Sequence, residues 1–507
     1  MKLITKARRV SRTSSIPSPI GGLNARDSYA AMDVKDAVKL ENWFPLPMSI
    51  QLRHGYSQYS TGLGTTVETI MAYNGGSVQK LIGVAGTNFY DCTAGGAVGA
   101  AVATCTNARW QHVNFATAGG YFLSCVNGVD NPKLFDGTTW TTPAITGVTL
   151  TDLIAVTVHM NRLWYVQKNT MKVWYLPVNS IAGAAASIDF SGLFKRGGYL
   201  MQMGSWTIDS GAGMDDHAAF ISSEGEVAIF KGTDPASITT WMLVGVYQVG
   251  APVGRRCISQ FASDLLIISQ DGLLPMSKAL MSSRVNTSIS LTDKIQHLMS
   301  QDVTDYGANF GWQCRLFPQA NMLILNVPSG GTDNYQYAMN TISGAWCKFT
   351  GWNAHCWEMY KNQIYFGDAL GNVCKAWDTL ADNGTNINSD VIQAFNYFGN
   401  QNLKHFKMSK PMFNTSSTSI GISFGLNFDF NFNTITSTPS FTPSTTAKWS
   451  TSKWNQSQWG SSNQILSNWQ SSSGVGYCAA AHISSASKNV DIQWQSTTLI
   501  FESGSGF

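Results

Sequence analysis

The sequence predicts an all-β protein: a β-propeller of about seven blades, joined to a β platform or sandwich built from the N- and C-terminal segments. Residues 206–280 show why, because short apolar runs (AAFI, VAIF, WMLVGVY, LLII) alternate with turn pairs such as Glu224-Gly225, Asp234-Pro235 and Asp271-Gly272. The runs are too short for confident helices, and their β-branched and aromatic residues favour strands. Similar units recur over residues 66–384, and residues 422–432 alternate strictly between apolar and polar.

Residues 1–20 are predicted to form a basic extended arm. Net charge is +3, but six basic residues precede the first acid, Asp27, which leaves the rest of the chain at −3. Pro17 and Pro19 disfavour a helix there. The charge pattern leaves open either a solvated terminus or a tether that docks on a partner subunit or on nucleic-acid phosphate. The docking candidates are Lys2, Lys6, Arg8, Arg9 and Arg12.

Residues 21–65 are assigned to the platform. Apolar spacing over residues 34–43 allows one short amphipathic helix, which Pro45 and Pro47 would stop, and strands are expected from Ile50 onwards.

Residues 66–384 are predicted to form the propeller. A blade takes about 40–50 residues, so a span of roughly 320 residues fits about seven blades, with six or eight left open. Stacking around an axis would bury faces that each small sheet cannot bury alone. Small-residue segments at 94–103, 181–199 and 282–305 are predicted to be excursions, the last with a short helix near 291–299.

Residues 385–507 are predicted to form a second β domain that completes the platform. Residues 422–432 would make a strand of roughly 35 Å at about 3.3 Å per residue. The Ser/Thr/Asn-rich stretch 434–473 is predicted to be a long loop, either anchored to its own core or serving as an interface. Its anchors would be four tryptophans: Trp449, Trp454, Trp459 and Trp469.

Composition restricts the function classes. Charged residues make up 12% of the 507-residue chain, about half the usual share, which favours an assembly component over a free-standing domain. The nine cysteines show no C-x-x-C spacing and suit a reducing compartment. No apolar run reaches about 18 residues and no apolar core follows the charged N-terminus, so neither a membrane span nor a secretory leader is expected.

The sequence gives little support for an active site, and no cofactor is expected. The eight histidines are dispersed, and neither a nucleophile elbow nor a phosphate-binding loop is found. The one metal candidate is a carboxylate cluster in a glycine-rich loop, Asp209, Asp215 and Asp216, whose spacing also fits ordinary turn chemistry. A sialidase-like or sugar-binding propeller remains an alternative, although the repeat S-x-D-x-G-x-x-W is absent as such.

An ordered series of motifs resembles the tail nozzle proteins of short-tailed bacteriophages, also called tail tubular or packaged-DNA stabilisation proteins. Its main part is W-T-x-D-x-G-x-G-x-D-D, S-x-E-G-E-V-A-I-F-x-G-T-D-P, V-G-V-Y-x-V-G-x-P-x-G-R-R and Q-D-G-L-L-P-M-S within residues 206–277. Further matches are G-G-L-N at 21–24, E-N-W-F-P at 41–45, R-H-G at 53–55, F-D-G-T-T-W at 135–140, K-R-G-G at 195–198, and M-N-T at 339–341 leading to G-A-W at 344–346.

The resemblance implies a non-enzymatic virion protein, made in the host cytoplasm. Six copies would form a ring below the portal and adaptor rings, around a channel that retains packaged double-stranded DNA and conducts it during ejection. Tail fibres, spikes and distal tail proteins are further candidate partners. A slightly acidic body is compatible with such a conduit, because strong phosphate binding would impede passage.

Overall fold

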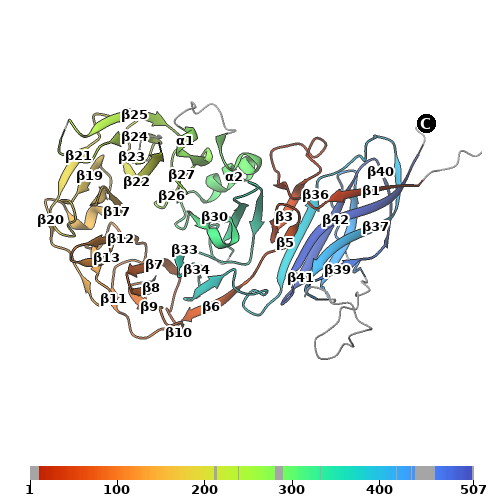
Figure 1. The fold of residues 1–507 in the computed structure, drawn as a ribbon, viewed down its shortest axis with the longest axis horizontal. Helices are drawn as coiled ribbons and strands as arrows, with labels where there is room; N and C mark the ends of the chain where they lie inside the picture. Colours follow the sequence, from red (N-terminus) through yellow and green to blue (C-terminus); the bar gives the residue numbers. More distant parts are fainter. Residues whose placement is uncertain are drawn as a thin grey trace, which may run out of the picture. The chain divides into compact units, whose positions relative to one another are not determined.

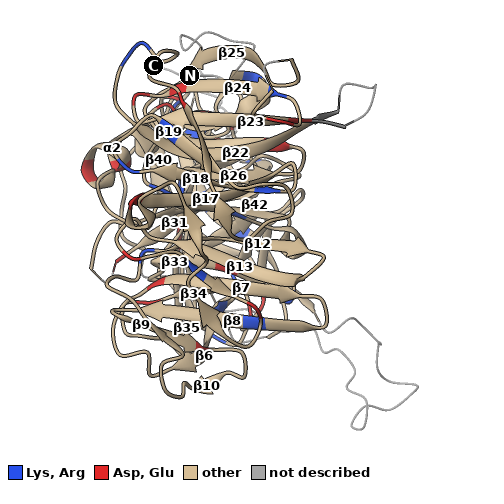
Figure 2. Ribbon diagram, turned by 90° about the vertical axis from the view of Figure 1, so that its left-hand side faces the viewer, with Lys and Arg blue, Asp and Glu red and all other residues tan. Residues whose placement is uncertain are grey.

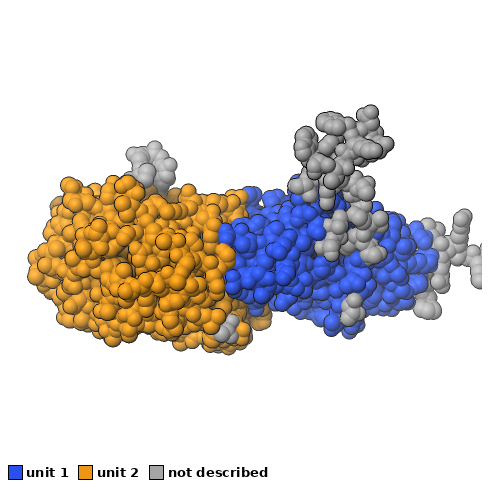
Figure 3. All heavy atoms as spheres, turned by 90° about the horizontal axis from the view of Figure 1, so that it is seen from below, with its two compact units in different colours: residues 1–56, 337–351, 377–507 blue, residues 57–336, 352–376 orange. Residues whose placement is uncertain are grey.

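The computed structural model describes residues 11–209, 214–237, 239–279, 289–331, 333–417, 420–435, 437–439 and 463–504. It divides into two compact units, coloured separately in Figure 3. One, which we call the two-sheet unit, comprises residues 1–56, 337–351 and 377–507; the other, the seven-sheet ring, comprises residues 57–336 and 352–376. Among the described residues, no helix is long and apolar enough to cross a membrane.

The seven-sheet ring is built from small, mainly antiparallel sheets that follow one another along the chain (Figure 1). A further parallel pair is formed by β16 (Ile145–Thr146) and β20 (Gly183–Ala184). The first sheet contains β7 (Val67–Gly75), β8 (Val78–Ala85), β9 (Asn88–Asp91) and β11 (Ala103–Thr104). The second contains β12 (Gln111–Thr117), β13 (Gly120–Val126), β14 (Lys133–Phe135) and β15 (Trp140–Thr141). The third contains β17 (Leu153–His159), β18 (Arg162–Gln167), β19 (Lys172–Tyr175) and β21 (Ala186–Asp189). The fourth is β22 (Leu200–Asp209), β23 (Met214–Ser222), β24 (Glu226–Lys231) and β25 (Met242–Gln248).

The last sheets close the ring. The fifth contains β26 (Ile258–Phe261), β27 (Asp264–Ser269) and β28 (Gly272–Pro275). The sixth consists of β29 (Gln313–Phe317) and β30 (Met322–Val327), the first two strands of a nine-stranded sheet. The seventh contains β33 (Cys356–Tyr360), β34 (Gln363–Gly367), β35 (Val373–Ala376), β6 (Tyr56–Thr61) and β10 (Gly96–Ala97). Because β6 precedes the first ring strand and pairs with β35, the beginning and the end of the ring share one sheet.

The innermost strands contact one another in a closed cycle: β7, β12, β17, β22, β26, β29, β33 and back to β7. The all-β prediction is confirmed, and this radial order of small sheets is the one that a propeller has. Apolar clusters fill the space between neighbouring sheets, for example Trp164 and Phe220 between the third and fourth sheets.

The two-sheet unit combines the chain ends. One sheet runs β39 (Gln464–Ser467), β37 (Lys404–Thr415), β42 (Ile492–Ser503), β5 (Ile50–Leu52) and β4 (Trp43–Pro45), with β1 (Ser11–Pro17) on β42 and β40 (Gln470–Gly476) on β37. The other consists of the remaining strands of the nine-stranded sheet, in the order β31 (Tyr335–Asn340), β32 (Trp346–Phe349), β3 (Asp36–Glu41), β36 (Ile387–Gln393), β41 (Ala479–Ser487) and β38 (Ile422–Phe428), with β2 (Gly22–Leu23) on β3. Phe406 and Phe428 join the two sheets, with ring centroids 5.4 Å apart.

A buried ion pair ties together distant segments of the two-sheet unit. Arg53 is fully buried and donates to both carboxylate oxygens of Asp382, at 2.8 and 2.6 Å. The same guanidinium donates to the carbonyl of Thr350 and to the side chain of Asn42. Three segments far apart in the sequence therefore depend on one side chain.

Several boundaries differ from the prediction. The predicted propeller span of 66–384 includes residues 337–351 and 377–384, which belong to the two-sheet unit, while residues 57–65 belong to the ring. The insertion at 337–351 lies there because its aromatic residues pack on the N-terminal segment, as Phe349 does on Phe44 at 6.1 Å. Such long-range packing leaves no local signal.

The predicted helix at 34–43 is wrong, because β3 and β4 occupy that stretch and β3 lies between β32 and β36. The helix expected near 291–299 exists but lies later, as a 3₁₀ turn (Asp293–Ile295) followed by α2 (Gln296–Tyr306). The strand expected over 422–432 ends at Phe428, because Asp429 and Phe430 adopt positive φ angles of 50° and 62° and turn the chain.

Two other expectations change. The excursions at 94–103 and 181–199 contribute outer strands, since β11 and β21 each complete a ring sheet through backbone pairing that small side chains permit. The predicted arm is extended at residues 11–17 but is not free there, because these residues form β1 and pair antiparallel with β42. Residues 1–10 lie outside the described residues.

Candidate functional site: the polar centre of the ring

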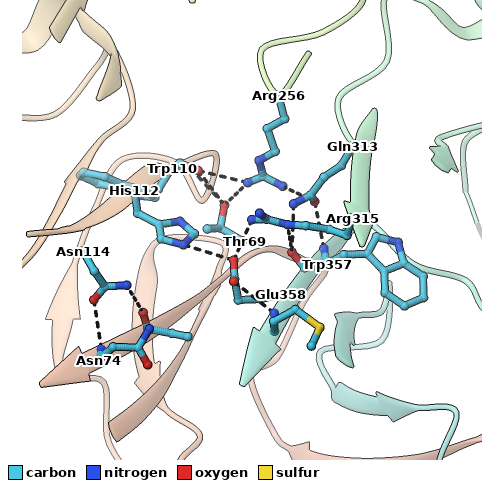
Figure 4. Close-up of polar contacts among 12 residues, drawn as sticks. Thr69, Asn74, Trp110, His112, Asn114, Arg256, Gln313, Arg315, Trp357 and Glu358 are labelled. Carbon is cyan, nitrogen blue, oxygen red and sulfur yellow. Dashed lines mark hydrogen bonds and ion pairs between the residues drawn. The ribbon is translucent and has the colours of Figure 1, made fainter. Parts of the chain in front are cut away.

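The innermost strands of all seven ring sheets line one small cavity of about 130 Å³. We call it the axial cavity. Its lining residues are Ile70, Gln111, His112, Ala155, Val156, Gln202, Arg256, Ile258, Gln313, Cys314, Arg315 and Trp357. Figure 4 shows the polar contacts on one side of it. With about 30 Å³ of liquid volume per water molecule, the cavity has room for about four waters.

Glu358 forms the ionic part of this centre. It is buried on β33, and its Oε2 atom lies 2.9 Å from Nη2 of Arg315 on β29 and 3.2 Å from Nε2 of His112 on β12. Burial alone would raise the pKa of Glu358, but the Arg315 charge and the bond with His112 outweigh it and lower the pKa to about 2. Glu358 is therefore ionised at neutral pH.

Arg256 has a different environment. Its Nη2 atom donates to the carbonyls of Glu68 and Trp110 and to the Thr69 hydroxyl, at 2.8–3.1 Å, and Nη1 lies 3.4 Å from the amide oxygen of Gln313 (Figure 4). All four acceptors are neutral. Burial lowers the pKa of Arg256 from its usual value, which an arginine tolerates while staying charged.

Polar side chains also bridge neighbouring sheets. Gln313 on β29 accepts from the backbone N–H of Trp357 and donates to its carbonyl, at 3.0 and 2.9 Å. Asn114 on β12 likewise makes two hydrogen bonds to β7: its amide oxygen accepts from the Asn74 N–H, and its amide nitrogen donates to the Ala72 carbonyl. These amides satisfy backbone groups that adjacent strands leave unpaired, so they hold the ring together.

The shifted carboxyl pKa values of the described residues bear on glycoside hydrolysis. Glycoside hydrolysis needs one carboxyl with a raised pKa beside one that stays ionised. In the part of the chain that the structure describes, every carboxyl with a clearly shifted pKa is lowered, because hydrogen bonds and nearby cations outweigh burial: Asp91, Asp130, Asp136, Asp189, Glu358 and Asp390.

The cysteines are equally unreactive. All nine are free, and eight are buried. Burial raises the pKa of Cys257, Cys314 and Cys356 to about 12 each, so none is a thiolate at neutral pH. Cys356, which follows His355, instead donates to the Val67 carbonyl at 3.2 Å. The adjacent His–Cys pair is a packed strand end.

The metal candidates are only partly described. The backbone of Asp209 ends β22, and Asp215 and Asp216 lie on β23, where Asp216 pairs with Thr207. The Asp216 carboxylate accepts from the Thr207 hydroxyl at 2.7 Å, while the side chains of Asp209 and Asp215 lie outside the described residues. Elsewhere in the described ranges, no group of three or more His, Cys, Asp or Glu is placed to hold a metal ion.

The candidate docking and interface residues are also only partly described. Lys2, Lys6, Arg8 and Arg9 lie outside the described residues, whereas Arg12 is exposed on β1. Trp449, Trp454 and Trp459 also lie outside them. Trp469 precedes β40, is 41% exposed, and carries the Lys410 ammonium 5.8 Å from its ring centroid.

A second, larger pocket of about 510 Å³ lies in the two-sheet unit. His482, Lys39 and Asp390 are among its lining residues. The Nε2 atom of His482 and the Nζ atom of Lys39 each lie 2.8 Å from a carboxylate oxygen of Asp390. Because the Asn427 oxygen accepts from Asn433 N–H, its amide donates to Nδ1 of His482, and the ring proton sits on Nε2. Both histidine nitrogens are occupied, so this histidine cannot activate the nearby Ser484 as a nucleophile.

None of the residues that line the axial cavity was a candidate site residue from the sequence. Glu358 and Arg315 are single charges within apolar strands, CWEMY and QCRLF, in a chain with few charges. Figure 2 shows how sparse charged residues are along the strands. A charge in an apolar strand is costly unless paired, and this pattern could have indicated an internal polar centre.

Comparisons with known proteins add little. No protein-family model matches the chain, and no curated protein matches it. Among solved structures, it is similar to the amino-terminal part of BBS1 in complex with ARL6 (9% identity, 65% of this chain and 99% of that chain, TM-score 0.39) and to the computationally designed Ika8 protein (9%, 63% and 99%, 0.33). It is also similar to an exo-β-1,3-galactanase from Phanerochaete chrysosporium with galactose (8%, 76% and 95%, 0.25). At these scores none of the likenesses carries an argument.

Proposed function

We propose that the chain is a structural virion protein, the nozzle of a short phage tail, whose copies form a ring-shaped channel that retains packaged DNA and conducts it during ejection. The proposal starts from the motif resemblance. The observation that supports it best is an exposed apolar strand at the outer edge of the ring, because a protein that works alone has no need of one.

That strand is β25, the last of its sheet. Its sequence, MLVGVYQ, carries no charge, and Met242, Leu243, Val244 and Val246 are all exposed. Monomeric proteins protect sheet edges with charges, prolines or short strands, because an apolar edge pairs with other chains. Two other outer strands of the ring, β11 and β15, have only two residues each, and β28 is buried.

The axial cavity is too small for DNA to pass through the ring of a single copy. A cavity of about 130 Å³ lined by all seven sheets leaves no bore for a duplex, whose major groove alone is about 12 Å wide. The channel in this proposal is therefore the space enclosed by several copies. We propose a homohexamer around double-stranded DNA, with the adaptor ring above and tail fibres, spikes or distal tail proteins as further neighbours.

The sialidase-like and sugar-binding alternatives have no observation in their favour. Glu358, which contacts the lining residues Arg315 and His112, is held by them in its ionised form, so it cannot donate a proton to a leaving group. We propose that the protein is not an enzyme.

The basic arm is proposed to dock on the adaptor. Because residues 11–17 pair with β42, deletion of residues 1–9 removes Lys2, Lys6, Arg8 and Arg9 without removing β1. We expect the truncated chain to fold and to bind the adaptor more weakly, especially at low salt. Unchanged incorporation into particles would remove any role for the arm.

The proposal as a whole is tested by the copy number. Native mass spectrometry and rotationally averaged electron microscopy of the assembly isolated from particles should give six copies around an open centre. Isolated single copies with no partner would contradict the proposal, and a glycan array would then test sugar binding.

A further inference from the structure

The axial cavity presents more hydrogen-bond donors than acceptors. Gln111 lines the cavity, and its Nε2 atom, which is buried, has no partner among the described residues. The Gln202 oxygen accepts from the N–H of Ile258 at 3.3 Å, which turns its amide NH₂ away from that strand. Arg256 and Arg315 add two guanidinium groups to the lining.

The charges around the cavity do not balance. Glu358 compensates Arg315, with which it is paired at 2.9 Å. Glu68, the other carboxylate near Arg256, is paired with Arg109 at 2.9 Å. Arg256 is left with neutral acceptors and with the ring of Phe310, whose centroid lies 4.8 Å away. Glu358 and Glu68 also act on Arg256 electrostatically, but each is paired with another arginine. A buried cation whose direct acceptors are all neutral is costly.

We propose that the axial cavity is a binding site for a small tetrahedral oxyanion of the size of phosphate or sulfate. Such an anion accepts hydrogen bonds at every oxygen, so it matches the Gln111 amide and the free donor capacity of the two arginines. It would give Arg256 a negatively charged partner in direct contact, at the point where all seven sheets meet. The ring is then braced by the anion, independently of whether the chain is a nozzle protein.

The size of the cavity limits the ligand. A volume of about 130 Å³ accommodates one tetrahedral oxyanion and one or two waters, but no nucleotide. His112 and Arg315 line the cavity, and both contact the ionised Glu358, which disfavours an anion on that side. Binding is therefore expected next to Arg256 and Gln111.

Titration of the purified full-length chain with sodium phosphate at constant ionic strength, against sodium chloride, tests the proposal. We expect one saturable site per chain by isothermal titration calorimetry and a Tm that rises with phosphate beyond the effect of chloride. A Tm that responds equally to the two salts, with no calorimetric binding, would mean that the cavity holds only water and would overturn the proposal.

Two variants locate the site. Gln111→Leu removes a donor to the anion and should weaken phosphate binding roughly tenfold or more, while the same change at the exposed Gln79 should have no effect. Gln111→Glu keeps the side-chain shape and places a carboxylate beside Arg256. It should abolish phosphate binding and raise the Tm measured without phosphate. Unchanged phosphate affinity in both folded variants would place the anion elsewhere and contradict the proposal.

Discussion

The axis of the seven-sheet ring and its outer edge use their side chains in opposite ways. At the axis, Glu358, Gln313 and Arg315 are committed to bonds between neighbouring sheets. At the edge, β25 presents uncharged apolar side chains with no strand beside them on the outer side. The difference teaches that the axis stabilises the subunit, whereas the edge is available to a partner. Substitutions should separate these two roles.

The largest effect on stability is expected at Arg53, whose buried ion pair with Asp382 sets the upper limit against which the losses at the axis can be compared. Arg53→Met would leave Asp382 buried without a counter-charge, and we expect a loss of about 3–5 kcal/mol in the free energy of unfolding. Urea denaturation measures it. The matched control is Arg26→Met, because the Arg26–Asp27 pair is exposed and should contribute about 0–1 kcal/mol. Equal losses of unfolding free energy in the two variants would show that the buried Arg53–Asp382 pair contributes no more than the exposed Arg26–Asp27 pair.

Glu358→Gln tests the axis. It keeps the shape of the side chain but removes the charge opposite Arg315 and His112, so we expect a loss of about 1–3 kcal/mol. The folded pKa of about 2 lies below the ordinary value of 4.5, so this stabilisation is complete above about pH 4.5 and disappears as the pH falls towards 2.

The pH dependence of stability tests whether Glu358 acts through its charge. Urea midpoints at pH 6 and pH 3 should differ less in Glu358→Gln than in the unmodified protein, since the variant has no carboxylate to protonate. A variant with the full acid sensitivity would show that Glu358 does not act through its charge.

Val244→Lys tests the edge. Val244 is 49% exposed on β25, so a lysine there should leave the Tm within a few degrees but weaken association, because a charge on an edge strand prevents strand pairing. Sedimentation velocity measures association. Val78→Lys is the control, with 47% exposure in a different sheet and outside β25. If both variants assemble normally, β25 is not an interface.

The smallest effect is expected at Trp469. Its contact with Lys410 is half-exposed, and such cation–π pairs contribute about 0.5–1 kcal/mol, so Trp469→Ala should scarcely change the unfolding midpoint. Reduced assembly with an unchanged midpoint would extend the interface to the two-sheet unit. A large drop in stability would instead make this tryptophan a core anchor.

Much of the fold was predictable because its signals are local. Short apolar runs between turn residues predicted the strands of residues 206–280, and their recurrence predicted a repeat of about seven units. The outer strand β21 was missed because Ala186 and Ser187 pair through their backbone and show no apolar pattern. The predicted helix at 34–43 failed because β3 owes its conformation to strands far away in the sequence.

The polar centre could not be predicted, for a related reason. Thr69, Arg256 and Glu358 are separated by more than 100 residues each and meet only because the ring closes. Arg315 and Glu358 stand out in the sequence as single charges in apolar strands, but nothing in the sequence showed that the two side chains meet at a common axis. The arrangement of the sheets creates the site.

Cryo-electron microscopy of the DNA-filled assembly isolated from particles tests the central claim most directly. We predict six copies that enclose duplex DNA in a common channel, with the axial cavity of every seven-sheet ring closed by its own side chains. Density for DNA that threads the ring of one copy, or an assembly without a channel between copies, would contradict the account.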